Sequence, residues 1–96
     1  MSLAIADKVV LVTGANAGLG YQISLALARG HAHVVMACRN AARAQEAQAR
    51  LLSEAPNARV TSLLVDMSEP ESVQAFGRSF AERVNQLDVV IHNAGV

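Results

Sequence analysis

The feature that most constrains the fold is a set of three glycines, Gly14, Gly18 and Gly20, between two apolar segments. Residues 9–12 are Val-Val-Leu-Val, which predicts a buried strand, and residues 19–29 predict a helix. A sharp strand-to-helix turn needs positive φ and a close backbone approach, and glycine supplies both. The helix then begins with unpaired N–H groups and a partial positive charge, which favour an anion such as a pyrophosphate. A glycine-rich turn without a ligand is the alternative.

Strand and helix patterns alternate along the rest of the chain, which predicts parallel βαβ units. We expect strands at residues 8–13, 33–38, 59–65 and 88–92, and helices at residues 19–29, 41–54 and about 69–85. Right-handed crossovers give the strand order 3-2-1-4, with the first two helices on one face and the third on the other. The expected fold class is therefore α/β, a Rossmann-type parallel sheet that forms part of a doubly wound fold. Its ligand would lie outside the carboxyl ends of the first and fourth strands.

Apolar side chains spaced three and four residues apart predict the inward face of each helix. On the first helix they are Leu19, Ile23, Ala26 and Leu27; on the second, Ala44, Ala47, Leu51 and Leu52; on the third, Val73, Phe76, Phe80 and Val84. Two short polar sequences mark helix starts. Asn40 is the expected N-cap of the second helix, and Ser68-Glu69-Pro70-Glu71 has the form of a capping box for the third.

The turn sequence Thr-Gly-x-x-x-Gly-x-Gly, from Thr13 to Gly20, resembles the cofactor turn of the short-chain dehydrogenase/reductase family. The resemblance covers the chain from its first strand to Gly95. It implies that these residues are the amino-terminal half of one Rossmann-type dinucleotide-binding domain. In the turn it implies cofactor contacts from Thr13, Gly14, Asn16, Gly18, Leu19 and Gly20.

The end of the second expected strand indicates the choice of cofactor. Arg39 stands about twenty residues after Gly20, where an NAD-binding fold usually has Asp or Glu for the ribose 2′-hydroxyl. The planar guanidinium of an arginine presents several N–H donors that suit a ribose 2′-phosphate instead. The neutral Asn40 beside it would not repel that phosphate. We therefore expect NADP(H) to be preferred over NAD(H). A solvated Arg39 without a ligand is the alternative. The segment 35–40 looks most like retinol-dehydrogenase-like members of the family and their NADPH-using relatives.

Two further strand ends carry residues that the resemblance assigns to the cofactor. Asp66 would accept a hydrogen bond from the adenine amino group, and Met67 would pack on the ring. Asp66 could also simply begin the cap of the third helix, and both roles can hold. The family's usual Asn-Asn-Ala-Gly appears here as His92 followed by Asn93, Ala94 and Gly95, which would line the cofactor. We expect His92 to be a structural imidazole.

The resemblance implies a chemistry that these residues do not carry by themselves. The family uses a later Ser and a Tyr-x-x-x-Lys pair, but Tyr21 is followed four residues on by Leu25, and the one lysine is Lys8. No catalytic residue is therefore assigned, and we expect the 96 residues alone to be inactive. The function implied is an oxidoreductase that transfers hydride between NADP(H) and an alcohol or carbonyl. The alternative is a non-catalytic dinucleotide-binding module that acts as a sensor or scaffold.

Composition excludes several other classes of protein. Hydrophobic residues make up 52% and charged residues 17%, which is too apolar for disorder, yet no apolar run is long enough to span a membrane. The formal net charge is zero and no basic stripe indicates nucleic acid. His31 and His33 have no third ligand nearby, so no metal site is predicted. The single Cys38 fits a reducing, cytoplasmic location. The family resemblance implies a homo-oligomer for the full-length protein.

Overall fold

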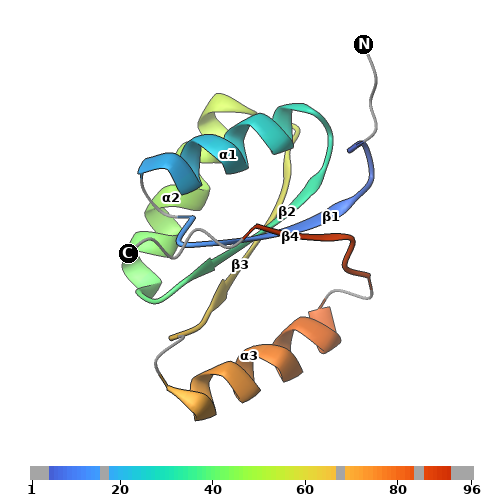
Figure 1. Ribbon diagram of the computed structural model, residues 1–96. Coiled ribbons are helices and arrows are strands. Elements are labelled where there is room, and N and C mark those ends of the chain that lie inside the picture. The colour runs from blue at the N-terminus through green and yellow to red at the C-terminus, as the bar shows by residue number, and fades with distance from the viewer. Residues whose placement is uncertain (1–4, 16–17, 67–68, 84–85, 92–96) are drawn as a thin grey trace.

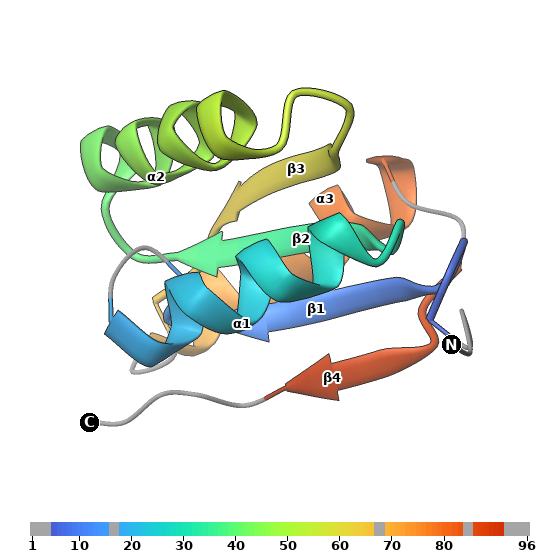
Figure 2. The ribbon, with the colours of Figure 1, turned by 90° about the horizontal axis from the view of Figure 1, so that it is seen from above.

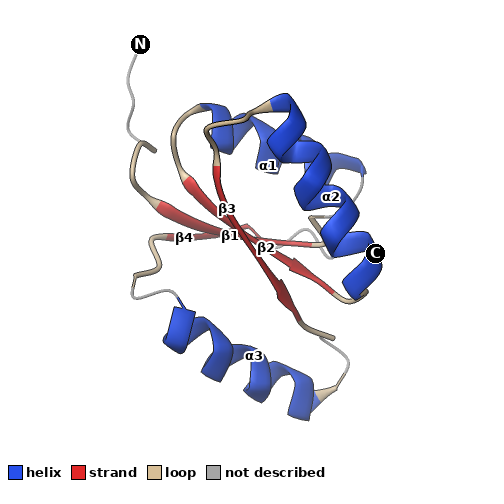
Figure 3. Cartoon of the chain, turned by 180° about the vertical axis from the view of Figure 1, so that it is seen from behind, coloured by secondary structure: helices blue, strands red, loops and turns tan. Residues whose placement is uncertain are grey.

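The computed structural model describes residues 5–15, 18–66, 69–83 and 86–91. Along the chain the elements are β1 (Val9–Thr13), α1 (Gly18–Arg29), β2 (His33–Cys38), α2 (Ala41–Glu54), β3 (Arg59–Leu64), α3 (Pro70–Arg83) and β4 (Val89–Ile91). The strands form one parallel sheet in the order β3-β2-β1-β4, which confirms the predicted fold class and topology. α1 and α2 cover one face and α3 covers the other (Figures 1 and 3).

The strands divide their side chains between two hydrophobic cores because successive residues of a strand point to opposite faces. Val10, Val12 and Met36 belong to the core under α1 and α2, together with Leu25 and Leu51 of those helices. On the other face the core contains Val9, Leu11, Val35, Ala37, Leu63 and Val65, with Phe76 and Phe80 of α3 packed against it. A sheet covered on both faces explains why β1 and β2 are almost continuously apolar.

The predicted inward face of the first helix is wrong. Leu19 is 67% exposed and Ala26 is also exposed, while Ile23 and Leu27 are only half-buried. The buried face of α1 is formed instead by Gly20, Tyr21, Ser24, Leu25 and Ala28. The helix is turned this way because the large Tyr21 ring is buried and its hydroxyl reaches a partner on α2.

The other two helices follow their predicted patterns more closely. In α2, Ala44, Ala47 and Leu51 are buried as expected, and Leu52 is half-buried. In α3 the rings of Phe76 and Phe80 lie 5.9 Å apart on the core side, whereas Val73 is 38% exposed. Val84 lies outside the described residues, as does Ser68 of the expected capping box.

Side-chain hydrogen bonds tie the elements together at their ends. The Asp88 carboxylate accepts from the backbone N–H of Val9 at 2.8 Å, which fixes the start of β1 to the segment before β4. The amide of Gln86 donates to the same carboxylate oxygen at 2.5 Å. Both hydrogen bonds lower the pKa of the Asp88 carboxyl, and the bond from Gln86 has the larger effect. Among the described residues no helix has the length and apolar character needed to cross a membrane.

Candidate functional site

All four strands point the same way, so their carboxyl ends meet at one edge of the sheet, where α1 and α2 begin (Figure 2). At this edge Thr13 ends β1 and is 6% exposed, with its hydroxyl oxygen 3.5 Å from the carbonyl oxygen of Ile91 in β4. Arg39 follows β2, and Asp66 lies two residues after β3. The structure therefore brings the turn, Arg39 and Asp66 to the same edge, as the sequence predicted from parallel pairing.

The glycine turn has the backbone conformation that the sequence predicted. Gly14 has φ +61° and Gly18 has φ +58°, both in the left-handed region that L side chains rarely adopt. The N–H of Gly14 donates to the carbonyl of Ala37 in β2 at 3.0 Å, so the first part of the turn is fixed to the sheet. A Cβ added at Gly18 would meet no described atom within 4 Å. The φ of Gly18 thus favours glycine, and the space that a Cβ would take is open among the described residues.

The start of α1 is suited to an anion. Its first turn contains no acidic residue, so nothing there neutralises the positive end of the helix dipole. Gly20 is buried, which lets the helix approach the sheet closely, and Leu19 next to it is 67% exposed. An exposed leucine beside unpaired helix N–H groups offers apolar contact to a ligand whose phosphates face the helix. Asn16 lies outside the described residues.

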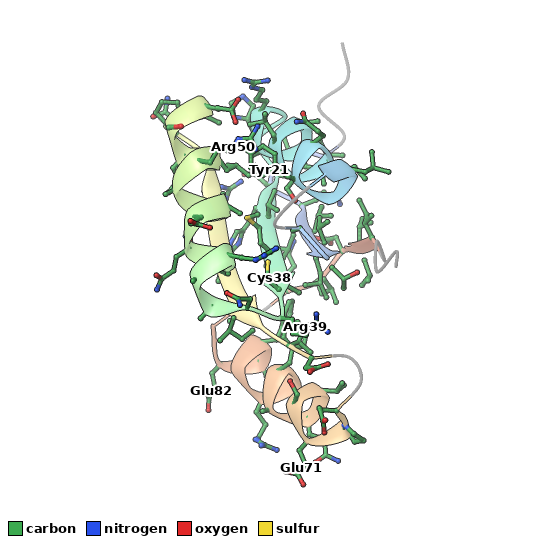
Figure 4. The ribbon with its side chains drawn as sticks, turned by 90° about the vertical axis from the view of Figure 1, so that its left-hand side faces the viewer. Tyr21, Cys38, Arg39, Arg50, Glu71 and Glu82 are labelled. Atoms are coloured by element: carbon green, nitrogen blue, oxygen red, sulfur yellow. The ribbon has the colours of Figure 1, made fainter. Side chains whose placement is uncertain are left out.

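The start of α2 places a cation beside this edge. Arg39 is exposed and directly follows the buried Cys38, as Figure 4 shows. Asn40 is confirmed as the N-cap of α2, since its side-chain oxygen accepts from the N–H of Arg43 at 3.0 Å. That oxygen is therefore engaged in holding the helix start. Arg43 is exposed one turn into the helix.

Asp66 is held by its backbone to the beginning of α3. Its N–H donates to the hydroxyl of Ser72 at 2.7 Å, and its carbonyl accepts from the N–H of Glu69 at 3.0 Å. The sequence left open a role for Asp66 in the cap of the third helix, and these bonds supply a link of that kind through the main chain. They do not engage the Asp66 carboxylate, so the assignment to the adenine remains a prediction. Met67 lies outside the described residues.

The carboxyl end of β4 lies at the same edge of the sheet as that of β1. β4 pairs with β1, with Ile91 opposite Val12. The predicted site residues that follow, Asn93, Ala94 and Gly95, lie outside the described residues, as does His92. Their assignment to the cofactor stays a prediction.

Sequence reasoning missed one polar cluster that joins the first turn of α1 to the end of α2. The Tyr21 hydroxyl donates to the Glu54 carboxylate, and the Arg50 guanidinium carbon lies 4.2 Å from the centroid of the Tyr21 ring. Burial, with the Glu54 carboxylate as the second cause, raises the pKa of Tyr21 to about 12. The i, i+4 spacing of Arg50 and Glu54 signalled their own ion pair, but nothing in the sequence signalled Tyr21 as their partner.

His31 and His33 lie at the opposite edge of the sheet, at the start of β2. The Nε2 atom of His33 is 2.9 Å from the Thr61 hydroxyl, and burial lowers the pKa of this imidazole, with Arg59 as a lesser cause. His31 is exposed, and its carbonyl accepts from Arg59 at 2.8 Å. In the described ranges no three His, Cys, Asp or Glu side chains form a cluster that could hold a metal ion.

Comparison with known proteins agrees with this geometry. Residues 8–96 match the family described as short chain dehydrogenase. Human WW domain-containing oxidoreductase is 44% identical over 87 residues, covering 91% of this chain and 21% of that protein. Bovine (Bos taurus) retinol dehydrogenase 12 is 37% identical over 89 residues, covering 93% of this chain and 28% of that protein.

A solved structure supports the same relationship. L-sorbose reductase from Gluconobacter frateurii, complexed with NADPH and L-sorbose, superposes with a TM-score of 0.89 at 32% identity. The superposition covers 100% of this chain and 36% of the reductase. The chain thus corresponds to about a fifth to a third of the length of these proteins.

Proposed function

The chain belongs to the short chain dehydrogenase family, and we propose that it is the cofactor-binding half of an NADP(H)-dependent oxidoreductase. The observation that carries the proposal is the glycine turn, with Gly14 and Gly18 at positive φ, open space beside Gly18, and α1 beginning there without an acidic side chain. Backbone N–H groups at such a helix start bind a pyrophosphate because their partial positive charge needs no side chain.

The residues at this edge fit the parts of a dinucleotide. The first turn of α1 would hold the pyrophosphate, with the exposed Leu19 in apolar contact beside it. Arg39 would hold the 2′-phosphate with its fork of N–H donors. Asp66, Met67 and the segment 93–95 would line the adenine and the rest of the cofactor. A bound nicotinamide dinucleotide supplies or accepts the hydride, and these residues bind and orient it.

NADP(H) is proposed on the position of Arg39. Its exposed side chain follows β2 at the edge that also carries the glycine turn. The likeness to an L-sorbose reductase complexed with NADPH supports the same choice. The proposed substrate is a small alcohol or carbonyl compound. The catalytic residues are proposed to lie beyond this chain, since Tyr21 is buried against α2 and hydrogen-bonded to Glu54.

The remaining expectations concern the complete protein. We propose a cytoplasmic homo-oligomer that needs neither a metal ion nor a nucleic acid. The location rests on the single, buried Cys38, and the oligomer on the family resemblance. No observation in the described residues favours the non-catalytic alternative.

The proposal is tested with the protein produced from its complete reading frame. We expect it to bind NADPH and to oxidise it when offered aldehydes or ketones, which the loss of reduced-nicotinamide absorbance measures. We expect the 96 residues alone to give no turnover. Binding without turnover over a broad carbonyl panel would favour the non-catalytic alternative, and absence of binding would overturn the proposal.

A further inference from the structure

Tyr21 occupies an unusual place for a buried phenol, because it lies in the first turn of α1, directly after Gly20 of the glycine turn. The residue is 1% exposed, and its hydroxyl donates to the carboxylate of Glu54 on α2. Packing alone would be satisfied by a phenylalanine ring. The hydroxyl adds a directed link between two helices, and a buried hydroxyl without such a partner would be destabilising.

Arg50 completes the cluster from one turn earlier in α2. Its guanidinium carbon lies 4.2 Å from the centroid of the Tyr21 ring, within the range of a cation–π interaction. Its Nε atom lies 3.5 Å from the Glu54 carboxylate oxygen that accepts from Tyr21. Figure 4 shows Arg50 and Tyr21 side by side between the two helices. The Tyr21 hydroxyl is protonated and able to donate throughout the physiological range, since its pKa is raised from 10 to about 12 and both values lie well above neutral pH.

We propose that Tyr21, Glu54 and Arg50 form an anchor that fixes the first turn of α1 and thereby positions its N–H groups for the dinucleotide pyrophosphate. The inference rests on the proposed function and deepens it. Tyr21 is a positioning residue here, since its hydroxyl is engaged by Glu54 and acts on the ligand only through the backbone of its own helix turn.

The anchor matters because a helix start has little else to hold it. The first N–H groups of a helix have no partner within the helix, so the first turn is its least constrained part. The Ser24 hydroxyl donates to the Gly20 carbonyl at 2.9 Å. This hydrogen bond lies within α1 and does not join the helix to another element. Beside the apolar packing of the Tyr21 ring, the side-chain hydrogen bond described from this turn to α2 is therefore that of Tyr21 to Glu54.

The test compares dinucleotide affinities of variants of the complete protein. Tyr21→Phe keeps the ring and removes only the hydroxyl, and Glu54→Leu removes the acceptor together with the ion pair to Arg50. We expect each to weaken NADPH and NADH alike, by about three- to tenfold, and the double variant to lose little more than either single one. Glu54→Gln keeps an acceptor oxygen and should retain most of the affinity.

Two controls separate positioning from general loss of stability. Ser62→Ala also removes one hydroxyl, which donates to the Gln48 side chain at 2.7 Å and joins β3 to α2. It should lower the melting temperature without changing dinucleotide affinity. Adenosine 2′-monophosphate lacks the pyrophosphate, so its affinity should be unchanged in Tyr21→Phe.

The possible results separate a failure of the proposed anchor from a failure of the proposed dinucleotide binding. An unchanged NADPH affinity in Tyr21→Phe, beside normal binding by the unaltered protein, would overturn the inference and leave the proposed function standing. Equal losses for NADPH and adenosine 2′-monophosphate would also overturn it, because the effect would not be specific to the pyrophosphate. If the unaltered protein bound neither dinucleotide, the proposed function and the inference would both fail.

Discussion

Replacing Arg39 with alanine should change the choice of cofactor and leave the fold intact. Arg39 is exposed and lies just after β2, and its guanidinium makes no hydrogen bond or ion pair with the residues that the structure describes. Its removal should therefore cost little stability, within about 0.5 kcal/mol for a surface position. What it removes is a fork of N–H donors at the edge where the ribose of a dinucleotide would lie.

The size of the effect follows from the charge on the ligand and the exposure of the side chain. A 2′-phosphate carries nearly two negative charges near neutral pH. Hydrogen bonds to charged groups contribute roughly 1.5–3 kcal/mol, but solvent and salt weaken them at an exposed residue. We therefore expect NADPH affinity to fall about ten- to a hundredfold, nearer the lower figure at physiological salt, at 1.4 kcal/mol per decade. NADH lacks the phosphate and should bind Arg39→Ala almost as it binds the unaltered protein.

The assay is titration of both dinucleotides at low and physiological salt, followed by nicotinamide fluorescence. Arg43→Ala is the matched control, since it removes a guanidinium that is also exposed and lies in the first turn of α2. We expect it to have a smaller effect on NADPH, and the effect of Arg39→Ala to shrink as salt rises. Equal losses of NADPH and NADH in Arg39→Ala, or tighter binding of NADH by the unaltered protein, would refute the assignment of Arg39 to the phosphate.

Two predictions concern the scaffold that carries the site. Leu51 is 0% exposed, so Leu51→Ala should lower the free energy of unfolding by about 2–5 kcal/mol in urea titration. Leu52 is half-buried, so Leu52→Ala should lower it clearly less. Equal losses would contradict the packing described for α2. Asp88→Asn should be less stable than the unaltered protein near pH 7. Because the pKa of Asp88 is lowered in the folded state, that stabilisation is complete above its unfolded pKa and disappears as the pH falls through the folded value. The two unfolding midpoints should therefore converge only once the pH lies below the folded pKa, which is itself below the unfolded pKa of about 4. A gap independent of pH would show that the carboxylate charge plays no part.

The sheet could be predicted from the sequence because its signals are local. Val9–Thr13 and His33–Cys38 are apolar runs bounded by polar or glycine residues, and handedness rules then leave few topologies. The N-cap at Asn40 was equally local, since a short polar side chain stands directly before the helix. The glycine turn was predicted for the same reason, and its positive φ values confirm it.

The orientation of α1 could not be predicted, because apolar residues occur on several of its sides. Leu19, Ile23 and Leu27 gave an acceptable stripe, yet the helix buries Tyr21 and Leu25. This face packs against the sheet and α2, and Tyr21 also bonds to Glu54, far along the chain. Periodicity within one helix carries no information about these partners. A tertiary partner therefore overrode the local pattern.

The hydrogen bonds around Asp66 and Asp88 were missed for a related reason. Asp66 binds through its backbone, which no side-chain motif reveals, and its partner is the hydroxyl of Ser72. Asp88 accepts from Val9 at the opposite end of the chain. The Asp66 bond is local, but it depends on the turn that leads into α3. The Asp88 bond exists only once the sheet has brought distant segments together.

The central claim is that the start of α1 binds the phosphates of a dinucleotide, and a pair of substitutions at Gly18 tests it most directly. Asn and Asp both tolerate the left-handed conformation of this residue better than other side chains do, and an added Cβ meets no described atom within 4 Å. The two side chains have nearly the same shape and differ in charge and in one amide group that replaces a carboxylate oxygen. An aspartate should stabilise the helix start at least as well as an asparagine does, because it complements the helix dipole.

The same charge should oppose a bound pyrophosphate. Two unit charges about 4 Å apart repel by roughly 1 kcal/mol in water and by more where solvent is partly excluded. The measurement is the NADPH and NADH affinity of Gly18→Asp relative to Gly18→Asn, with the melting temperature of each. We predict that Gly18→Asp melts no lower than Gly18→Asn yet binds both dinucleotides at least about fivefold more weakly. Equal affinities in the two variants would contradict the claim that the phosphates lie at the start of α1.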